Sequence, residues 1–240
     1  MQRQREKFTL LAVAVLLAGA LKFYYSTASV NGLRWVLAPT TRLVEVVTGE
    51  TFTFEAYAGY MNADHTFLIA ASCSGVNFLI AAFLLLAVMR IVRDDARWTT
   101  LPFALLAAYV TTIVANTVRI AIALRLHRTD HELTWIDPQQ LHRVEGIFIY
   151  FGFLLLLFVL CEGSWRGEVS SRGRSAWVRR ASLPLAIYWI TTLGIPVATG
   201  AFRQGRDFWE HALFVLVTPL ILMLALFLFR IARSGRIAFE

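Results

Sequence analysis

The sequence is poor in cysteine and in charged residues. It contains two cysteines among 240 residues, Cys73 and Cys161, so a disulfide framework is not indicated. Zinc-finger spacings, a glycine-rich phosphate-binding loop and internal repeats are all missing from the sequence, and no group of residues suggests a metal or a cofactor. These absences argue against zinc-binding, nucleotide-binding and repeat architectures.

Apolar sequence is what the chain has in abundance. Hydrophobic residues make up 58% of it, charged residues 16%, and the mean hydropathy is +0.60. Several apolar runs approach the ~20 residues that a helix needs to cross a bilayer. The net charge of +7 reflects membrane topology rather than nucleic-acid binding, because the basic residues cluster between these runs. The composition therefore predicts an all-α polytopic membrane protein in contact with the lipid bilayer.

Six apolar runs are candidate transmembrane helices. The first could instead be a cleaved signal peptide, because small residues follow it, but the aromatic residues after Lys22 favour a retained anchor. The predicted spans are about 8–25, 66 or 71 to 89, 101–124, 144–161, 183–199 and 212–229.

Residues 26–65 predict a small extracytoplasmic cap. An amphipathic stretch at 33–47, interrupted by Pro39, predicts a short helix along the membrane surface. Alternating residues at 51–57 predict a strand, and the turn residues that follow suggest a small hairpin leading to Cys73. The polar residues 125–143 predict a second, shorter cap.

We expect one integral membrane domain over residues 1–240. Its core spans would lie within 66–161, and two additional spans would lie within 181–231. Between the predicted spans, basic residues are concentrated on alternate sides, which places both termini in the cytoplasm. Under this assignment the cytoplasmic segments hold 14 of the 23 Lys and Arg residues, and they are 1–7, 90–100, 162–180 and 230–240.

This topology brings three reactive residues from three helices to the outer membrane face: Cys73, Arg119 and His142. Cys73 lies among small residues at the predicted start of a helix, where the helix dipole favours a thiolate. An arginine within a span costs ~2.5 kcal/mol or more, so Arg119 either faces a polar site or snorkels to the interface. Histidine can act as a base near neutral pH. Cys161 falls at the cytoplasmic face.

Together these residues match nucleophilic catalysis on a peptide carbonyl. Cys73 would be the nucleophile, His142 its general base, and Arg119 a group that stabilises the oxyanion or the substrate. The ordinary alternatives are an inert buried cysteine, a snorkelling arginine and a loop histidine. Glu145 could orient His142, although a solvated position is the more usual role. Asn77 and Asn116 could line a substrate cleft, or could bond to a neighbouring helix.

The motifs resemble the exosortase/archaeosortase family of polytopic membrane cysteine transpeptidases. The similar segments are Ser72-Cys73-Ser74-Gly75 before an apolar helix, Asn116-Thr-Val-Arg119-Ile120 at the end of another, and His142 followed by Glu145-Gly146-Ile147. The resemblance covers roughly residues 40–160, and the last two predicted spans carry no matching motif. It implies Cys73 as nucleophile, with Arg119 and His142 as its essential partners.

The resemblance also implies a substrate class and a location. The substrates would be membrane-anchored proteins with a C-terminal sorting signal of the PEP-CTERM type, cut on the outer side of the inner (cytoplasmic) membrane. The product would be transferred to a surface acceptor of unknown identity, in a process linked with exopolysaccharide production. Two alternatives stay open: a membrane cysteine protease that only hydrolyses, and a non-enzymatic component of surface-polymer assembly.

Overall fold

The structure is a computed structural model of the whole chain. It describes residues 2–93, 97–128, 138–163, 174–198, 203 and 205–236. Within these ranges, the described part excludes the side chains of residues 138–143, 163, 174–179, 196, 198, 206–207 and 230–236.

Among the described residues, five helical segments are long and apolar enough to cross a membrane. The chain is therefore a mostly helical, multi-pass membrane protein, and five of the six predicted spans overlap these helices. The five are α1 (Gln2–Thr27), α3 (Val76–Val92), α4 (Thr100–Arg128), α5 (Pro138–Gly163) and α8 (Arg206–Arg236).

The predicted span 183–199 is not among those five helices. Its residues are divided between α6 (Arg174–Trp189), the π-helical segment η2 (Ile190–Gly194) and α7 (Ile195–Ala198). Helix α6 also begins well before the apolar run, in polar sequence. The change of helical geometry at Ile190 ends α6, so no single α-helix covers the run.

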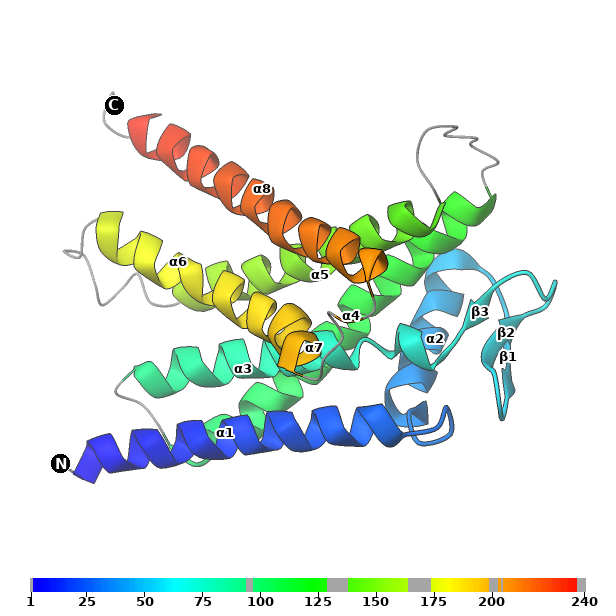
Figure 1. Ribbon diagram of the computed structural model, residues 1–240, viewed down its shortest axis with the longest axis horizontal. Helices are drawn as coiled ribbons and strands as arrows, with labels where there is room; N and C mark the ends of the chain where they lie inside the picture. The colour runs from blue at the N-terminus through cyan, green and yellow to red at the C-terminus, as the bar shows by residue number, and fades with distance from the viewer. Residues whose placement is uncertain are drawn as a thin grey trace.

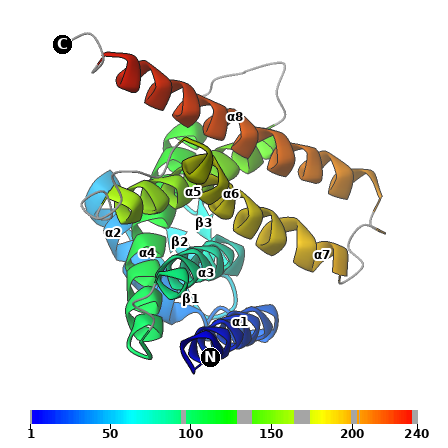
Figure 2. The same ribbon diagram turned by 90° about the vertical axis from the view of Figure 1, so that its left-hand side faces the viewer.

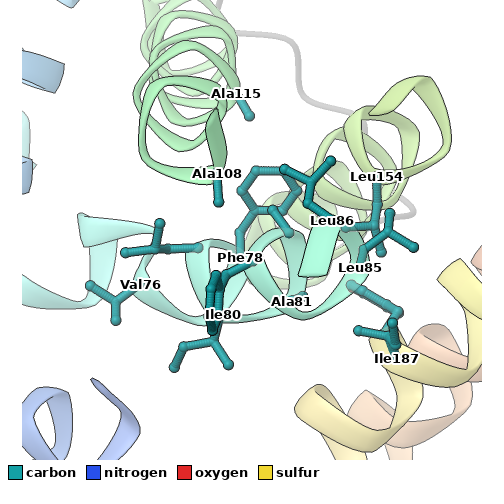
Figure 3. Packing of buried hydrophobic residues seen from close by; sticks show 14 of the residues in the cluster. Val76, Phe78, Ile80, Ala81, Leu85, Leu86, Ala108, Ala115, Leu154 and Ile187 are labelled. Carbon is teal, nitrogen blue, oxygen red and sulfur yellow. The ribbon is translucent and has the colours of Figure 1, made fainter. Parts of the chain in front are cut away.

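Helix α3 is the centre of the bundle. Its sequence is apolar on all sides, which is the pattern of a helix that is buried all round. Helices α1, α4, α5 and α6 surround it (Figure 2). Ala108 of α4, Leu154 of α5 and Ile187 of α6 belong to the buried cluster that encloses α3, with Phe78 and Leu85 among its own side chains (Figure 3).

The two ends of the bundle differ. The start of α1 and the end of α8 lie at one end, whereas the small sheet lies at the other (Figure 1). This is the arrangement that a topology with both termini on one side of the membrane requires. Which membrane face each end occupies stays a prediction.

The predicted surface helix exists as α2 (Arg34–Thr48), and it packs against α4. The interruption predicted at Pro39 is wrong, because the helix continues through this residue. A proline inside a helix leaves the carbonyl four residues earlier without its amide donor. That carbonyl belongs to Trp35, and the hydroxyl of Tyr109 in α4 donates to it at 2.7 Å. The neighbouring helix thus supplies the hydrogen bond that Pro39 removes.

The same arrangement occurs in the C-terminal part of the chain. Pro219 lies inside α8 and deprives the carbonyl of Val215 of its helical donor. The indole Nε1 of Trp189, at the end of α6, donates to that carbonyl at 3.1 Å. An aromatic donor from an adjacent helix therefore joins the two elements at the proline.

The predicted hairpin is confirmed, and a third strand extends it. Strands β1 (Phe52–Glu55), β2 (Gly59–Asn62) and β3 (Leu68–Ile69) form an antiparallel sheet in the order β1-β2-β3. Gly59 has φ +134°, and a Cβ there would overlap the carbonyl of Ile69. Glycine is therefore required where β2 and β3 approach.

The predicted polar segment 125–143 is largely helical at both ends. Helix α4 continues to Arg128 and α5 begins at Pro138, and residues 129–137 lie outside the described residues. The extension of α4 contacts the cap, because Arg128 forms an ion pair with Glu50. The ring of His127 also lies 6.1 Å from that of Phe67.

Candidate active site

Cys73 lies on a short 3-10 turn, η1 (Ala71–Ser74), immediately before α3. Its amide donates to the carbonyl of Ala70 at 2.9 Å, and the residue is half-buried. The α-helix itself begins only at Val76, and β3 occupies residues 68–69. A start of the second span at Thr66 is therefore wrong, whereas Cys73 does lie at the N-terminal end of this span.

Gly75 joins the cysteine turn to α3. Its φ of +71° lies in the left-handed region that favours glycine. A Cβ at this position would lie 3.2 Å from the Thr112 side chain, 3.3 Å from the amide of Asn116 and 3.4 Å from the hydroxyl of Tyr150. The missing side chain lets the turn bearing Cys73 pack tightly against α4 and α5.

Asn116 connects the cysteine turn to both neighbouring helices. It is completely buried in α4, and its amide Nδ2 donates to the backbone carbonyl of Cys73. Its Oδ1 accepts hydrogen bonds from the hydroxyl of Tyr150 at 2.8 Å and from Nε of Arg119 at 3.4 Å. All three contacts require the same orientation of the amide group.

Arg119 is buried, with 8% of its surface exposed, so it does not snorkel to the interface. Its guanidinium lies beside the side chain of Cys73 and interacts by charge with Cys73 and Glu145. The same group lies over the ring of Tyr150, 5.5 Å from the ring centre. A Cβ on Gly146 would lie 3.7 Å from Arg119, so the arginine packs against the backbone of α5. The result is a fixed cation beside the cysteine sulfur.

Glu145 also belongs to this cluster, although a solvated position is the role that sequence reasoning favoured for it. Both of its carboxylate oxygens are buried, so it does not take the solvated position that is usual for glutamate. Its charge acts on Arg119. A carboxylate near a buried guanidinium compensates part of the cost of placing that cation inside a membrane protein.

His142 lies within α5 rather than in a loop before it. Its position is one turn before Gly146, the residue against which Arg119 packs, and residues four apart share a helix face. The side chain of His142 lies outside the described residues. The distance from its imidazole to Cys73 therefore stays a prediction.

Two other residues named from the sequence lie away from the cluster. Asn77 is exposed in the first turn of α3, and its Oδ1 accepts a hydrogen bond from Lys22 of α1 at 2.7 Å. Cys161 lies close to Arg90 and Arg93, at the C-terminal end of α3. The two cysteines are therefore at opposite ends of the bundle, as the topology predicts, and both are free.

Tyr150 is the site residue that sequence reasoning missed. It lies in an apolar run, so the sequence alone indicates an ordinary aromatic residue of the core. A signal was nevertheless present, because Tyr150 follows Gly146 by four residues and His142 by eight, which is the spacing of one helix face. Its pairing with Asn116 depends on how α4 and α5 pack, and no local pattern shows that.

Comparison with known protein families now bears on this geometry. The model of the transmembrane exosortases matches residues 7–160. The chain belongs to the transmembrane exosortase family. The resemblance seen in the sequence motifs is thereby confirmed, and the match spans the elements from α1 to α5 that build the cluster around Cys73. Neither curated proteins nor solved structures give a match to the chain.

Proposed function

We propose that this exosortase is a cysteine transpeptidase that cleaves C-terminal sorting signals of exported, membrane-anchored proteins. The observation that carries the proposal is the contact between the buried Arg119 guanidinium and the side chain of Cys73. A cation fixed beside a thiol favours the thiolate, which is the reactive form of cysteine. Asn116 holds both groups, so their relative position is set before a substrate arrives.

The first chemical step forms a thioester. His142 takes the proton of the Cys73 thiol and becomes an imidazolium, the thiolate attacks the scissile carbonyl, a sulfur–carbon bond forms, and the carbonyl electrons move to oxygen. Negative charge thus moves from sulfur to oxygen within reach of Arg119, which stabilises both. The intermediate collapses, the peptide carbon–nitrogen bond breaks, and the leaving amine takes a proton from the His142 imidazolium.

The second step releases the processed protein. His142 takes a proton from the acceptor nucleophile, which attacks the thioester carbon. The sulfur–carbon bond then breaks and the Cys73 thiolate is restored. With water as the nucleophile the same steps give hydrolysis. The nature of the acceptor thus separates a transpeptidase from a protease.

The proposed location is the extracytoplasmic face of the cytoplasmic membrane. The distribution of basic residues supports it, because that topology puts the cap and Cys73 outside. A membrane-impermeant maleimide added to intact spheroplasts is expected to label Cys73 in a Cys161→Ser background, and labelling only after membrane disruption would contradict this orientation. The substrate would meet the site from within the bilayer, because its sorting signal contains a membrane helix.

Co-expression with a panel of tagged sorting-signal substrates tests the proposed reaction. We expect the wild-type protein and Cys161→Ala to shorten a substrate, and Cys73→Ala to leave it intact. Mass analysis of the new C-terminus distinguishes the products: an attached group indicates transfer, and a free carboxylate indicates hydrolysis. Cleavage that persists in Cys73→Ala would contradict the proposal. An inserted Cys73→Ala protein that still supports surface-polymer assembly would favour the non-enzymatic alternative.

A further inference from the structure

Tyr150 contacts three of the groups that surround Cys73: Asn116, the turn at Gly75 and Arg119. Its hydroxyl donates to Oδ1 of Asn116 at 2.8 Å, and the same hydroxyl lies 3.4 Å from the Cβ position of Gly75. The face of its ring lies under the guanidinium of Arg119, with 5.5 Å between the guanidinium carbon and the ring centre. A single side chain of α5 thus touches the turn, the amide and the cation.

The ring itself is fixed by α3. Phe78 stacks on Tyr150 with ring centres 5.1 Å apart and an interplanar angle of 15°. Phe78 is 3% exposed and belongs to the buried core around α3. Stacking on the buried Phe78 leaves the tyrosine ring little freedom to tilt, so the ring limits where the Arg119 guanidinium can lie.

The hydroxyl of Tyr150 also controls the orientation of Asn116. The amide oxygen has two acceptor sites, which Tyr150 and Arg119 occupy, and the amide nitrogen donates to the Cys73 carbonyl. Without the hydroxyl, one of the two contacts that hold this oxygen is lost in a buried environment. The amide can then turn, which loosens both the Cys73 turn and the Nε contact of Arg119.

We propose that Tyr150 is a positioning residue that fixes Arg119 against the Cys73 sulfur. Its ring packs against the guanidinium, and its hydroxyl acts on the same group through Asn116. This inference rests on the proposed function in taking Cys73 as the nucleophile. Tyr150 need not touch substrate. Its effect reaches the reaction through the charge environment of the thiol, so its removal changes the reactivity of Cys73 even when no substrate is present.

The test is the rate of Cys73 alkylation by iodoacetamide as a function of pH, in the purified full-length protein with Cys161→Ser. Tyr150→Phe keeps the ring and its stacking on Phe78 and removes only the hydroxyl. We expect its alkylation rates to lie about tenfold below those of the wild type near neutral pH, because Arg119 and the Cys73 turn are then no longer held together through Asn116. Tyr150→Leu, which also removes the ring, is expected to lower the rates further.

Tyr109→Phe is the matched control. It deletes a hydroxyl that donates to a backbone carbonyl in the cap, at Trp35, outside the cluster. We expect this variant to lose thermal stability and to keep the wild-type profile. A Tyr150→Phe profile that coincides with wild type would overturn the inference, and so would an equal loss of rate in Tyr109→Phe, which would indicate general loosening.

The assay also separates this inference from the proposed function. Substrate processing that persists in Cys73→Ala would remove the proposed reaction, but it would not alter the alkylation result. Slower alkylation together with intact processing by Tyr150→Phe would instead overturn the claim that this positioning serves the reaction. If Tyr150→Leu fails to fold, the conservative Tyr150→Phe variant decides the question.

Discussion

The two cysteines of this exosortase invite direct comparison. Both are free and half-buried, both lie near arginines, and they occupy opposite ends of the bundle. The difference is how the arginine is held. Arg90 is exposed at the end of α3, whereas Arg119 is buried and contacts Asn116 and Tyr150. Proximity to a positive charge is therefore common to both ends, and at the sheet end that charge is buried and held by Asn116 and Tyr150.

The largest expected effect separates the two thiols themselves. Cys73→Ala removes the proposed nucleophile and should lower substrate processing on the order of 10³-fold or more. Cys161→Ala removes a thiol outside the cluster and should leave processing within about twofold, which is the effect of an ordinary distant substitution. The measurement is the rate of substrate shortening at equal membrane levels of each variant. Equal losses of substrate processing in the two variants would contradict the proposed difference between Cys73 and Cys161.

A second comparison concerns the two arginines. Arg119→Lys keeps the positive charge but loses the planar guanidinium that reaches Cys73, Asn116 and the face of Tyr150. We expect a fall in processing of about 10²-fold, by analogy with the loss of one fixed oxyanion donor. Arg90→Lys, at an exposed position, should process substrate normally. If Arg119→Lys retained full activity, charge alone would suffice and the fixed geometry would be irrelevant.

Thiol reactivity should reveal the same contrast without any substrate. In detergent-solubilised protein, iodoacetamide should modify Cys73 about tenfold faster than Cys161 at neutral pH, because Cys73 lies on a short turn beside a buried, fixed guanidinium. Single-cysteine variants, Cys161→Ser and Cys73→Ser, allow each rate to be measured separately. Arg119→Lys should bring the rate of Cys73 down toward that of Cys161. Equal rates in the two single-cysteine proteins would remove the physical basis of the comparison.

The smallest expected effect lies on stability alone. Tyr109→Phe leaves the Trp35 carbonyl without the donor that replaces its helical partner, and should reduce the unfolding free energy by about 1 kcal/mol. Denaturant titration in detergent would measure this loss. Because the lost hydrogen bond joins α4 to the cap and lies outside the cluster, Cys73 alkylation and processing should be preserved. A loss of activity larger than the loss of stability would show that the cap and the cluster are coupled.

Much of the helical framework follows from local sequence pattern. Apolar length located five long helices, each of which overlaps one of the six predicted spans, because crossing a bilayer sets a length that any sequence must meet. Alternation of side chains located the first hairpin. The two-residue strand β3 escaped notice, because its pairing with β2 depends on a close backbone approach at Gly59 rather than on alternation.

Features that arise between elements were harder to predict. Pro39 suggested a break in the chain, but Tyr109, some seventy residues away, supplies the missing hydrogen bond. The run at 183–199 is apolar enough to suggest a span, yet a π-helical segment at Ile190 divides it. Such outcomes are settled by packing partners, and the residues concerned carry no local sign of them.

The candidate site also contains both residues that the local sequence predicts and residues that depend on packing between helices. Arg119 could be predicted as a site residue by itself, because a charged side chain within an apolar span is energetically costly and usually faces a polar site or a partner. Cys73 and Asn116 gained meaning from their order and spacing. In its local sequence Glu145 resembles a surface carboxylate, and Tyr150 resembles a core aromatic residue. Both become part of the site only because α5 packs against α4. The sequence therefore indicates a buried polar network mainly through the member that is most costly to bury, here the arginine. The other members are only partly predictable from the sequence.

The most direct test of the central claim is to identify the residue that carries a covalent substrate adduct. A tagged sorting-signal substrate would be incubated with the full-length protein, the reaction quenched in acid, and the adduct located by peptide mass spectrometry. The account predicts a hydroxylamine-sensitive thioester on Cys73, absent from Cys73→Ala and unaffected by Cys161→Ala. An adduct on any other residue, or processing by Cys73→Ala at the wild-type rate, would contradict it.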